Sequence, residues 1–332
     1  MTCLTNLFPH PLRGLLLVTP FLLSTGLANL TLFLLPFAKL LLPSSLIHTL
    51  CSLIAGTLVY RFIQHIFTAI NSAEITFSGD TPLPNESAIV ISNHVAWSDF
   101  YLVQAAADKA NMGGHTRYFA KAGLKWVPFL GGLWGMGMPT VTREWTRDKR
   151  ELERVFRGVK EEGWKTWLVS FSEGSRFTPE KYLQSRLWCR QNGKPQPEYL
   201  LYPRTRGFIA TVQHLRKAPH VKAVYDLTLA YQCGEEFQKA PTMWETIAVP
   251  KLSLTREQGG VGYRFHVHVR RFPIEELPGD AAGLAKWLEQ RWVEKGRWLE
   301  ARRLRWASVD VLRKTDGIFG GMGRVVDEDS RT

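Results

Sequence analysis

The stretch ESAIVISNHVAWSDFYLVQAAADKA, residues 86–110, contains the signals that decide the fold. Residues 88–91 form a short, mostly β-branched apolar run that ends in hydrogen-bonding residues, which predicts a buried strand. A helix is expected to follow, with Ser98 as its N-cap and Asp99 in the first turn, where the helix dipole favours an anion. A buried strand that leads directly into a helix is typical of an α/β domain.

The same alternation continues along the chain. Apolar or alternating runs predict further strands at 116–122, 139–143, 166–174, 221–232 and 263–272. Amphipathic helices are expected after Asp148, at 205–217 and from Asp280. We therefore predict an α/β fold with a largely parallel sheet flanked by helices, in which ligands gather at the carboxyl ends of the strands.

The N-terminal region is apolar and carries no acidic residue before Glu74. Two uncharged stretches, 14–38 and 40–60, each reach the ~20 residues that a helix needs to cross a bilayer. They predict an N-terminal membrane helical hairpin, either two spans or two interfacial helices, and prolines at 20, 36 and 43 complicate simple spanning. A buried helix pair of a soluble core is the alternative. The predicted division is a membrane hairpin at 1–72, a mixed domain at 73–305 and a flexible tail at 306–332.

The net charge limits the expected binding partners, and the cysteine spacing bears on whether a metal site is expected. A net charge of +12 predicts attraction to nucleic acid, an anionic membrane or a phosphorylated substrate. We find no concentrated basic helix, finger spacing or nucleotide-stacking motif, so nucleic acid is not expected as a partner. The four cysteines lack CxxC spacing, and His266 with His268 is interpreted as part of a solvated strand face; no metal site is predicted.

His94 and Asp99 form the first candidate site. In one continuous helix they would point about 140° apart, but they can meet if His94 follows the strand and Asp99 begins the helix. The carboxylate would then hold the proton of one imidazole nitrogen and leave the other nitrogen free as a base. No nucleophilic serine accompanies this pair, so the nucleophile would come from the substrate, and a hydroxyl would suit. A histidine that merely caps the following turn is the alternative.

A second constellation is VSFSEGSRF, residues 169–177, where another strand leads into a polar turn. Gly174 allows backbone amides to approach an anion, while Ser175 and Arg176 supply a hydroxyl and a forked cation for phosphate. Lys121 and Arg143 are expected at the ends of other strands. Basic side chains at several strand ends would come together at one binding site at that edge of the sheet. A simple strand-to-loop turn with a surface arginine is the alternative.

Taken together, NHVAWSD, VTR, EGSR and YPRTRGF resemble, in this order and after a hydrophobic hairpin, the 1-acylglycerol-3-phosphate and lysophospholipid acyltransferase family, in its eukaryotic branch. The resemblance covers roughly residues 85–210. It implies that His94 is the general base, that Asp99 orients it, and that neighbouring Asn93 supports them. It further implies roles for Arg143 and for Glu173, Gly174, Ser175 and Arg176 of the third motif, and it places Pro203 near the acyl or CoA region. The chain departs from many members at Ala96, where they have serine, and at Ser175, where they have threonine.

The resemblance implies acyl transfer from acyl-CoA, as co-substrate and without a cofactor, to the free hydroxyl of a lysophospholipid. We expect 1-acylglycerol 3-phosphate as the acceptor, with Arg143, Arg176 and Lys121 holding its phosphate. Lysophosphatidylinositol, lysocardiolipin and glycerol 3-phosphate are alternative acceptors, and a non-catalytic lipid-binding membrane protein is the alternative from another class. The bilayer is the expected partner, and the resemblance implies the endoplasmic reticulum membrane with the active site facing the cytosol. The sequence leaves acyl-chain preference, oligomeric state and the oxyanion donor open.

Overall fold

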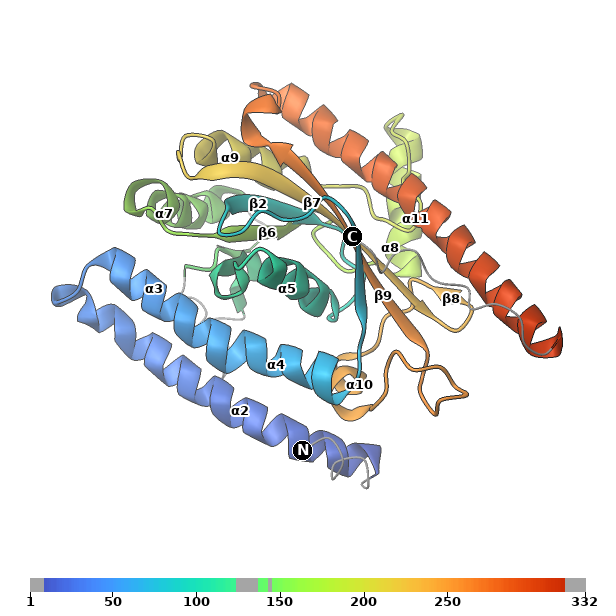
Figure 1. The fold of residues 1–332 in the computed structure, drawn as a ribbon. Helices are drawn as coiled ribbons and strands as arrows, with labels where there is room; N and C mark the ends of the chain where they lie inside the picture. The colour runs from blue at the N-terminus through green and yellow to red at the C-terminus, as the bar shows by residue number, and fades with distance from the viewer. Residues whose placement is uncertain (1–8, 124–136, 143–144, 320–332) are drawn as a thin grey trace.

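The computed structural model describes residues 9–123, 137–142 and 145–319, and in this part of the chain a seven-stranded sheet lies between two layers of helices (Figure 1). The strands of the main sheet are β1 (Ile75–Gly79), β2 (Ser87–Ser92), β3 (Thr116–Tyr118), β6 (Trp167–Phe171), β7 (Val221–Cys233), β8 (Glu236–Phe237) and β9 (Tyr263–Pro273). A separate two-stranded sheet pairs β4 (Ala120–Lys121) with β5 (Thr140–Val141).

The α-helices fall into an N-terminal group and a group that follows β2 in the chain. The first group comprises α2 (His10–Leu34), α3 (Ser44–Ala55) and α4 (Arg61–His65); α3 and α4 belong to one helical segment, Ser44–Ile70, that includes two π-helical turns. The second group comprises α5 (Asp99–Lys109), α7 (Trp145–Glu162), α8 (Pro179–Gln191), α9 (Thr205–Leu215), α10 (Met243–Ala248) and α11 (Ala281–Phe319).

The sheet order is β1-β9-β7-β2-β6-β3, with β8 beside β7. The pairs β1–β9, β7–β2, β2–β6 and β6–β3 are parallel, which confirms the predicted α/β class with a largely parallel sheet. Only the β7–β9 and β7–β8 pairs of the described sheet are antiparallel. Strand direction was not foreseen for β9, because alternation of apolar residues marks a strand without saying which way it runs.

Strand β2 lies in the middle of the core, and all of its residues are buried. Ala88 and Val90 pack into the cluster formed with α5 and the N-terminal helices, whereas Ile89 and Ile91 pack into the cluster formed with α7, α9 and α11. Because successive side chains of a strand point to opposite faces, a run that is apolar at every position requires helices on both sides. Figure 1 shows this arrangement, with α5 on one side of the sheet and α7, α9 and α11 on the other.

The N-terminal hairpin packs against the sheet domain along much of its length. Fully buried Arg13, near the start of α2, donates to the Ala248 carbonyl at 2.8 Å and to Asn71 Oδ1 at 2.6 Å. In the second arm, Ser52 Oγ accepts from the Arg117 guanidinium at 2.7 Å. Both arms are therefore tied to the domain by buried polar contacts as well as by apolar packing.

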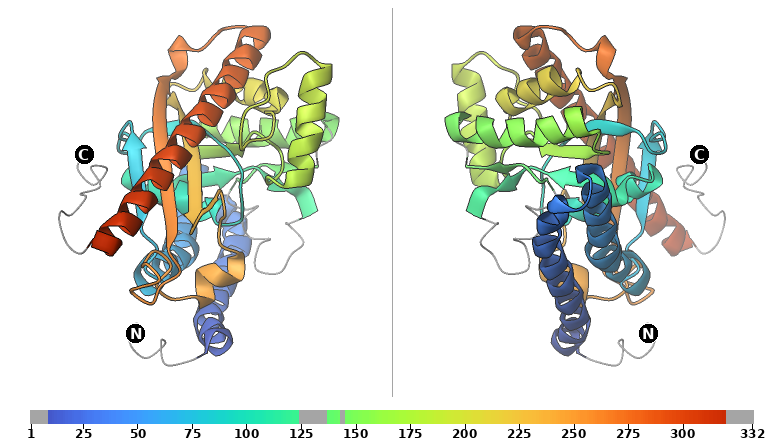
Figure 2. Two further views of the ribbon diagram at one scale, coloured as in Figure 1. Left: turned by 90° about the vertical axis from the view of Figure 1, so that its right-hand side faces the viewer. Right: turned by 90° about the vertical axis from the view of Figure 1, so that its left-hand side faces the viewer.

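One face of the hairpin remains uncovered. By length and composition, His10–Leu34 and Ser44–Ile70 could each cross a membrane, but the apolar window of the first is 22% buried and that of the second is 50% buried. Figure 2 shows α2 as the outer helix of the pair in both side views. Large exposed apolar side chains of α2 are Leu12, Leu15, Leu16, Leu22, Leu23, Leu27, Leu30, Phe33 and Leu34.

The structure corrects two sequence-based expectations. His266 does not lie on a solvated face, because it is fully buried under α11, where its ring contacts Thr76, Ser78 and Arg302. The predicted flexible tail from residue 306 is helical as far as Phe319, and residues 320–332 lie outside the described residues. The helix continues because Trp306 is buried against the domain and Asp310 forms an ion pair with Arg264.

A tight contact between the hairpin and the domain gives the first prediction. A methyl group at Gly114 would lie 2.6 Å from the Ser52 carbonyl oxygen, so Gly114→Ala must push the second arm away from the sheet domain. We expect a loss of about 1–3 kcal/mol in the free energy of unfolding. Thermal unfolding of the detergent-solubilised protein, followed by circular dichroism, measures this loss.

The matched control is Gly207→Ala in α9, where an added methyl group would meet nothing within 4 Å. Because this helical position has room for the added methyl group, the change should leave the free energy of unfolding unaltered or raise it by up to about 1 kcal/mol. Equal melting temperatures for the Gly114 variant, the control and the wild type would show that the second arm does not pack closely on the domain.

Candidate active site

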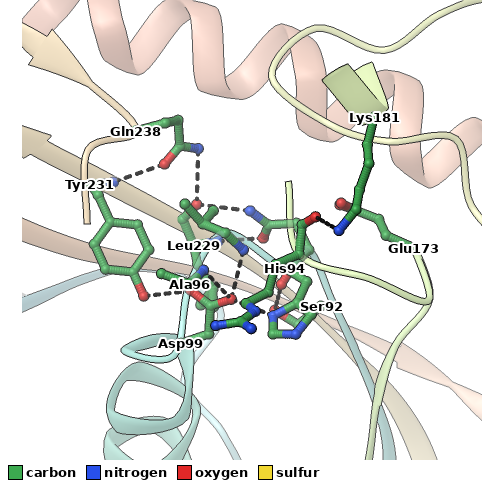
Figure 3. Close-up of polar contacts among 12 residues, drawn as sticks. Ser92, His94, Ala96, Asp99, Glu173, Lys181, Leu229, Tyr231 and Gln238 are labelled. Carbon is green, nitrogen blue, oxygen red and sulfur yellow. Dashed lines mark hydrogen bonds and ion pairs between the residues drawn. The ribbon is translucent and has the colours of Figure 1, made fainter. Parts of the chain in front are cut away.

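His94 and Asp99 meet at the carboxyl end of β2, in the turn that leads into α5. His94 Nδ1 lies 2.7 Å from Asp99 Oδ2 (Figure 3). Since an ionised carboxylate can only accept, this contact assigns the proton to Nδ1 and leaves the lone pair on Nε2. The imidazole also stacks on Phe171, at 4.2 Å between ring centroids and 16° between planes. The ring is therefore oriented by both a hydrogen bond and a neighbouring aromatic face.

The Asp99 carboxylate is buried and takes four hydrogen bonds. Oδ2 accepts from His94 and from the backbone amides of Val95, at 2.7 Å, and Ala96, at 3.1 Å. Oδ1 accepts from the Tyr231 hydroxyl at 2.7 Å. Ser98 was expected to cap α5, but its side chain makes no capping hydrogen bond. The backbone of Ser98 is itself helical (φ −62°, ψ −12°), and the amides of Phe100 and Tyr101, which a cap would bind, already donate to the backbone carbonyls of Trp97 and Ser98.

Asn93 connects the end of β2 to β7. Its amide nitrogen donates to the Leu229 carbonyl at 3.0 Å, and its oxygen accepts from the Leu229 amide at 2.8 Å. Asn93 is fully buried, so this two-bond contact is shielded from water. The residue before the histidine thus fixes the strand end from which the imidazole projects.

The loop after β6 carries the third motif and lies against His94. The Phe177 amide donates to the His94 carbonyl at 2.8 Å, and the Gly174 amide donates to the Phe171 carbonyl at 3.0 Å. Gly174 has φ = 71°, and a Cβ there would lie 2.9 Å from atoms of the Arg204 side chain. Glycine is therefore required both by the left-handed backbone and by the close packing of Arg204.

Glu173 is a buried residue of this loop, and its side chain reaches Trp292 of α11. The indole Nε1 donates to Glu173 Oε1 at 3.4 Å. Burial, the largest effect, raises the pKa of Glu173 to about 8; contacts with Leu201 and Trp292 oppose this rise, and the charge of Asp99 adds to it. The carboxyl group is therefore mostly neutral at pH 7, so it can donate a hydrogen bond as well as accept one.

The structure brings some predicted site residues together and leaves others apart. Ser175 is half-buried in the loop beside His94, and Arg176 is exposed there. Pro203 is buried next to Arg204, whose amide donates to the Ser172 carbonyl at 2.7 Å, so the fourth motif contacts the third. Lys121 is exposed at the end of β4, which belongs to the separate small sheet. Arg143 lies outside the described residues.

Sequence reasoning missed three residues that contact the site. Tyr231 approaches from β7, Trp292 from α11, and Phe171 lies under the imidazole. Each lies in a predicted strand or helix, but no spacing rule connects residues so far apart in the chain. The sequence does show that Tyr231 and Trp292 carry a hydroxyl and an indole N–H, and such groups need a hydrogen-bond partner when they are buried. It does not show which residue that partner is.

Chemically, the site offers an oriented base beside a loop that carries a cation. His94 Nε2 can accept a proton from a hydroxyl, and the ionised Asp99 can stabilise the imidazolium that forms. Among the described residues, no group of three or more His, Cys, Asp or Glu side chains is placed to hold a metal ion.

Comparisons with known proteins agree on one family. The family model described as "Acyltransferase" matches residues 74–232, and the one described as "Acyltransferase C-terminus" matches residues 258–301. An uncharacterized acyltransferase of Schizosaccharomyces pombe is 31% identical over 218 residues, which cover 65% of this chain and 59% of that protein. The 1-acyl-sn-glycerol-3-phosphate acyltransferase delta of Bos taurus is 31% identical over 216 residues, covering 65% of this chain and 53% of that protein.

Lysocardiolipin acyltransferase 1 of Danio rerio is 28% identical over 230 residues, or 68% of this chain and 55% of that protein. This chain thus spans a little over half the length of these curated relatives. Among solved structures, the 1-acyl-sn-glycerophosphate acyltransferase PlsC of Thermotoga maritima superposes with a TM-score of 0.47 and 15% identity, covering 88% of this chain and 98% of that one.

The raised pKa of Glu173 predicts a pH-dependent contribution to stability. The folded state keeps a proton on Glu173 up to about pH 8, whereas the unfolded chain releases it near the ordinary value of 4.5. Between these values the folded state binds more protons, so the contribution of Glu173 to stability falls as pH rises. Glu173→Gln removes this titration. We therefore expect the variant to gain stability relative to wild type as pH increases from 5 to 8.

Thermal unfolding of both proteins at several pH values measures the effect, with Glu180→Gln as the control because Glu180 is exposed. A difference between Glu173→Gln and wild type that stays constant with pH would contradict a raised pKa.

Proposed function

Since this chain belongs to the acyltransferase family that acts on lysophospholipids and glycerophosphates, we propose that it moves a fatty acyl group from acyl-CoA to the free hydroxyl of 1-acylglycerol 3-phosphate, giving phosphatidic acid. The observation that carries this proposal is the His94–Asp99 pair, which has its Nε2 lone pair available beside the loop of Arg176. A thioester is already activated, so the reaction needs no metal or prosthetic group.

In the proposed reaction, His94 Nε2 takes the proton of the acceptor hydroxyl while that oxygen attacks the thioester carbonyl carbon. The new C–O ester bond forms, the C–S bond breaks, and CoA leaves as the thiol after it receives the proton from the imidazolium. Asp99 stabilises the imidazolium throughout. The nucleophile is the substrate hydroxyl, so no acyl-enzyme intermediate forms. The Gly174 amide is our candidate for the oxyanion donor, although it also contacts the Phe171 carbonyl.

Phosphate recognition is assigned to Arg176, Arg143 and Lys121. Arg176 is exposed on the loop that contacts the His94 carbonyl, which supports a position near the reacting hydroxyl. A guanidinium can grip a phosphate with two parallel hydrogen bonds, and the net charge of +12 favours anionic substrates over the whole surface. Asn93, Ser175 and Pro203 support the shape of the site in the same proposal.

A lysocardiolipin acceptor is the second candidate, because one relative carries that name. Both acceptors present a phosphate and a free glycerol hydroxyl, so the same base and cations would serve. Lysophosphatidylinositol and glycerol 3-phosphate are further acceptors that the proposed chemistry allows.

The bilayer is the proposed partner of the N-terminal hairpin. The second arm of the hairpin packs on the sheet domain. Helix α2, the first arm, exposes a continuous face of leucine and phenylalanine side chains. This arrangement favours insertion of the outer face into one leaflet, since two spanning helices would have to detach from their buried polar contacts. Following the family, we place the protein in the endoplasmic reticulum membrane with the site facing the cytosol.

Removal of the proposed base is the most direct variant test. His94→Ala should lower the rate of acyl transfer by ~10²–10⁴ while the protein stays folded and membrane-bound. Asp99→Asn should also be severe, because it keeps the shape but removes the charge beside the imidazolium. The assay follows radiolabelled oleoyl transfer to 1-acylglycerol 3-phosphate. His214→Ala on α9 is the matched control, since His214 is exposed; near-normal activity of a folded His94→Ala protein would refute the assignment.

The phosphate assignment predicts a binding defect that is larger for the lysophospholipid than for acyl-CoA. Arg176→Ala should raise KM for the lysophospholipid more than KM for acyl-CoA, because it removes a charge-assisted contact worth about 1.5–3 kcal/mol. Arg176→Lys should recover part of the loss, since it restores the charge without the forked geometry. Arg143→Ala should behave like Arg176→Ala.

Initial rates are measured against each substrate while the other is saturating, with exposed Arg256→Ala as the control. A defect of Arg176→Ala that lies solely in acyl-CoA binding would show that the phosphate is placed wrongly.

A further inference from the structure

Tyr231 contacts the His94–Asp99 pair, although it belongs to none of the acyltransferase motifs. It lies on β7, its side chain is fully buried, and its hydroxyl is 2.7 Å from Asp99 Oδ1. The other carboxylate oxygen faces His94, so tyrosine and histidine bind opposite oxygens of one group. Figure 3 shows Tyr231 reaching the carboxylate from the side away from the imidazole.

The backbone of β7 at this point is held on both sides of the tyrosine. Gln238 binds Tyr231 twice: its side-chain Oε1 accepts from the Tyr231 backbone amide at 3.1 Å, and its backbone amide donates to the Tyr231 carbonyl at 2.8 Å. Asn93 binds Leu229, two residues earlier. These contacts fix the backbone of Tyr231 relative to the end of β2, which carries His94, and so they limit where the tyrosine hydroxyl can lie.

The hydroxyl acts as a donor at every working pH. Burial, followed by the charge of Asp99, raises the pKa of Tyr231 well above its ordinary value. The phenol thus remains protonated, and an ionised carboxylate beside it can only accept. The direction of this hydrogen bond follows from chemistry alone.

We propose that Tyr231 is a positioning residue for the His94–Asp99 pair. Its hydroxyl fixes the plane of the carboxylate so that Oδ2 stays directed at His94 Nδ1, and it takes up part of the negative charge. Without this donor, Asp99 would attract the imidazolium more strongly, and His94 would keep its proton to higher pH. This inference deepens the proposed function, on which its consequence for catalysis rests.

Other titratable groups near the His94–Asp99 pair also affect how the reaction rate depends on pH. Glu173 faces the pair from the β6 loop, and its pKa is raised to about 8, mainly by burial. Arg176 lies on the same loop. Ionisation of Glu173 affects the alkaline side of a rate profile, whereas the contribution of Tyr231 is expected on the acid side.

The test uses Tyr231→Phe, which removes one oxygen atom and keeps the ring. We expect the acid limb of the kcat/KM profile to move up by about 0.5–1 pH unit, because one of the carboxylate's hydrogen bonds is lost. The same upward shift should appear in the protonation of the His94 ring, followed by NMR and assigned by its absence in His94→Gln. The NMR readout does not depend on acyl transfer.

Tyr101→Phe is the matched control, because Tyr101 is also a buried tyrosine, but its hydroxyl meets Thr246 and lies away from the pair. It should leave both readouts unchanged. An Asp99→Asn background provides a second check, since Tyr231→Phe should there produce no further shift. If the Tyr231 variant is too unstable to assay, Gln238→Ala, which loosens the strand under Tyr231, should give a smaller shift in the same direction.

The outcomes separate this inference from the proposed function. An active wild type with identical profiles for Tyr231→Phe and Tyr101→Phe would overturn the role of Tyr231 and leave the acyltransferase proposal standing. A wild type inactive with every acceptor, but with a shifted His94 titration in Tyr231→Phe, would contradict the proposed function and support the positioning role. Unchanged His94 protonation in Tyr231→Phe overturns the inference in either case.

Discussion

Burial of the Asp99 carboxylate is the constraint on which the site depends. A buried charge is costly unless it is hydrogen-bonded, and hydrogen bonds to charged groups contribute about 1.5–3 kcal/mol each. Asp99 obtains its donors from the imidazole of His94, two amides of the turn before α5 and the hydroxyl of Tyr231. The turn between β2 and α5 must therefore bring its amides towards the carboxylate, which also places His94 at the strand end. A single charge thus determines the local backbone and the orientation of the base.

Distant parts of the chain stabilise this arrangement. Asn93 ties β2 to β7, the loop after β6 binds the His94 carbonyl, and α11 reaches Glu173 through Trp292. The N-terminal hairpin belongs to the same body, since Arg13 and Ser52 contact the domain directly. If the outer face of α2 enters a leaflet, the sheet domain is held at the membrane surface, where the proposed lysophospholipid acceptor would reside.

Much of this could be predicted from the sequence because the decisive patterns are local. The uniformly apolar run before His94 indicated a strand covered on both faces, and the spacing of His94 and Asp99 required a strand-to-helix turn for contact. The contacts of Tyr231 and Trp292 could not be predicted, since they depend on which strands become neighbours and on the path of α11. The antiparallel β9 was missed for the same reason. The sequence also could not show that β4, which carries Lys121, pairs with β5 in a separate small sheet, and the role of Lys121 in phosphate binding stays a prediction.

The central claim is that this site transfers an acyl group directly from acyl-CoA to a lipid hydroxyl. It is tested most directly by incubating the purified full chain in lipid vesicles with radiolabelled oleoyl-CoA and separate acceptors: 1-acylglycerol 3-phosphate, lysocardiolipin, lysophosphatidylinositol and glycerol 3-phosphate. Our account predicts that label enters a phospholipid ester, above all with 1-acylglycerol 3-phosphate, and that one free CoA thiol appears for each ester formed. Release of CoA with free oleate as the only product, or no release with any acceptor, would contradict it.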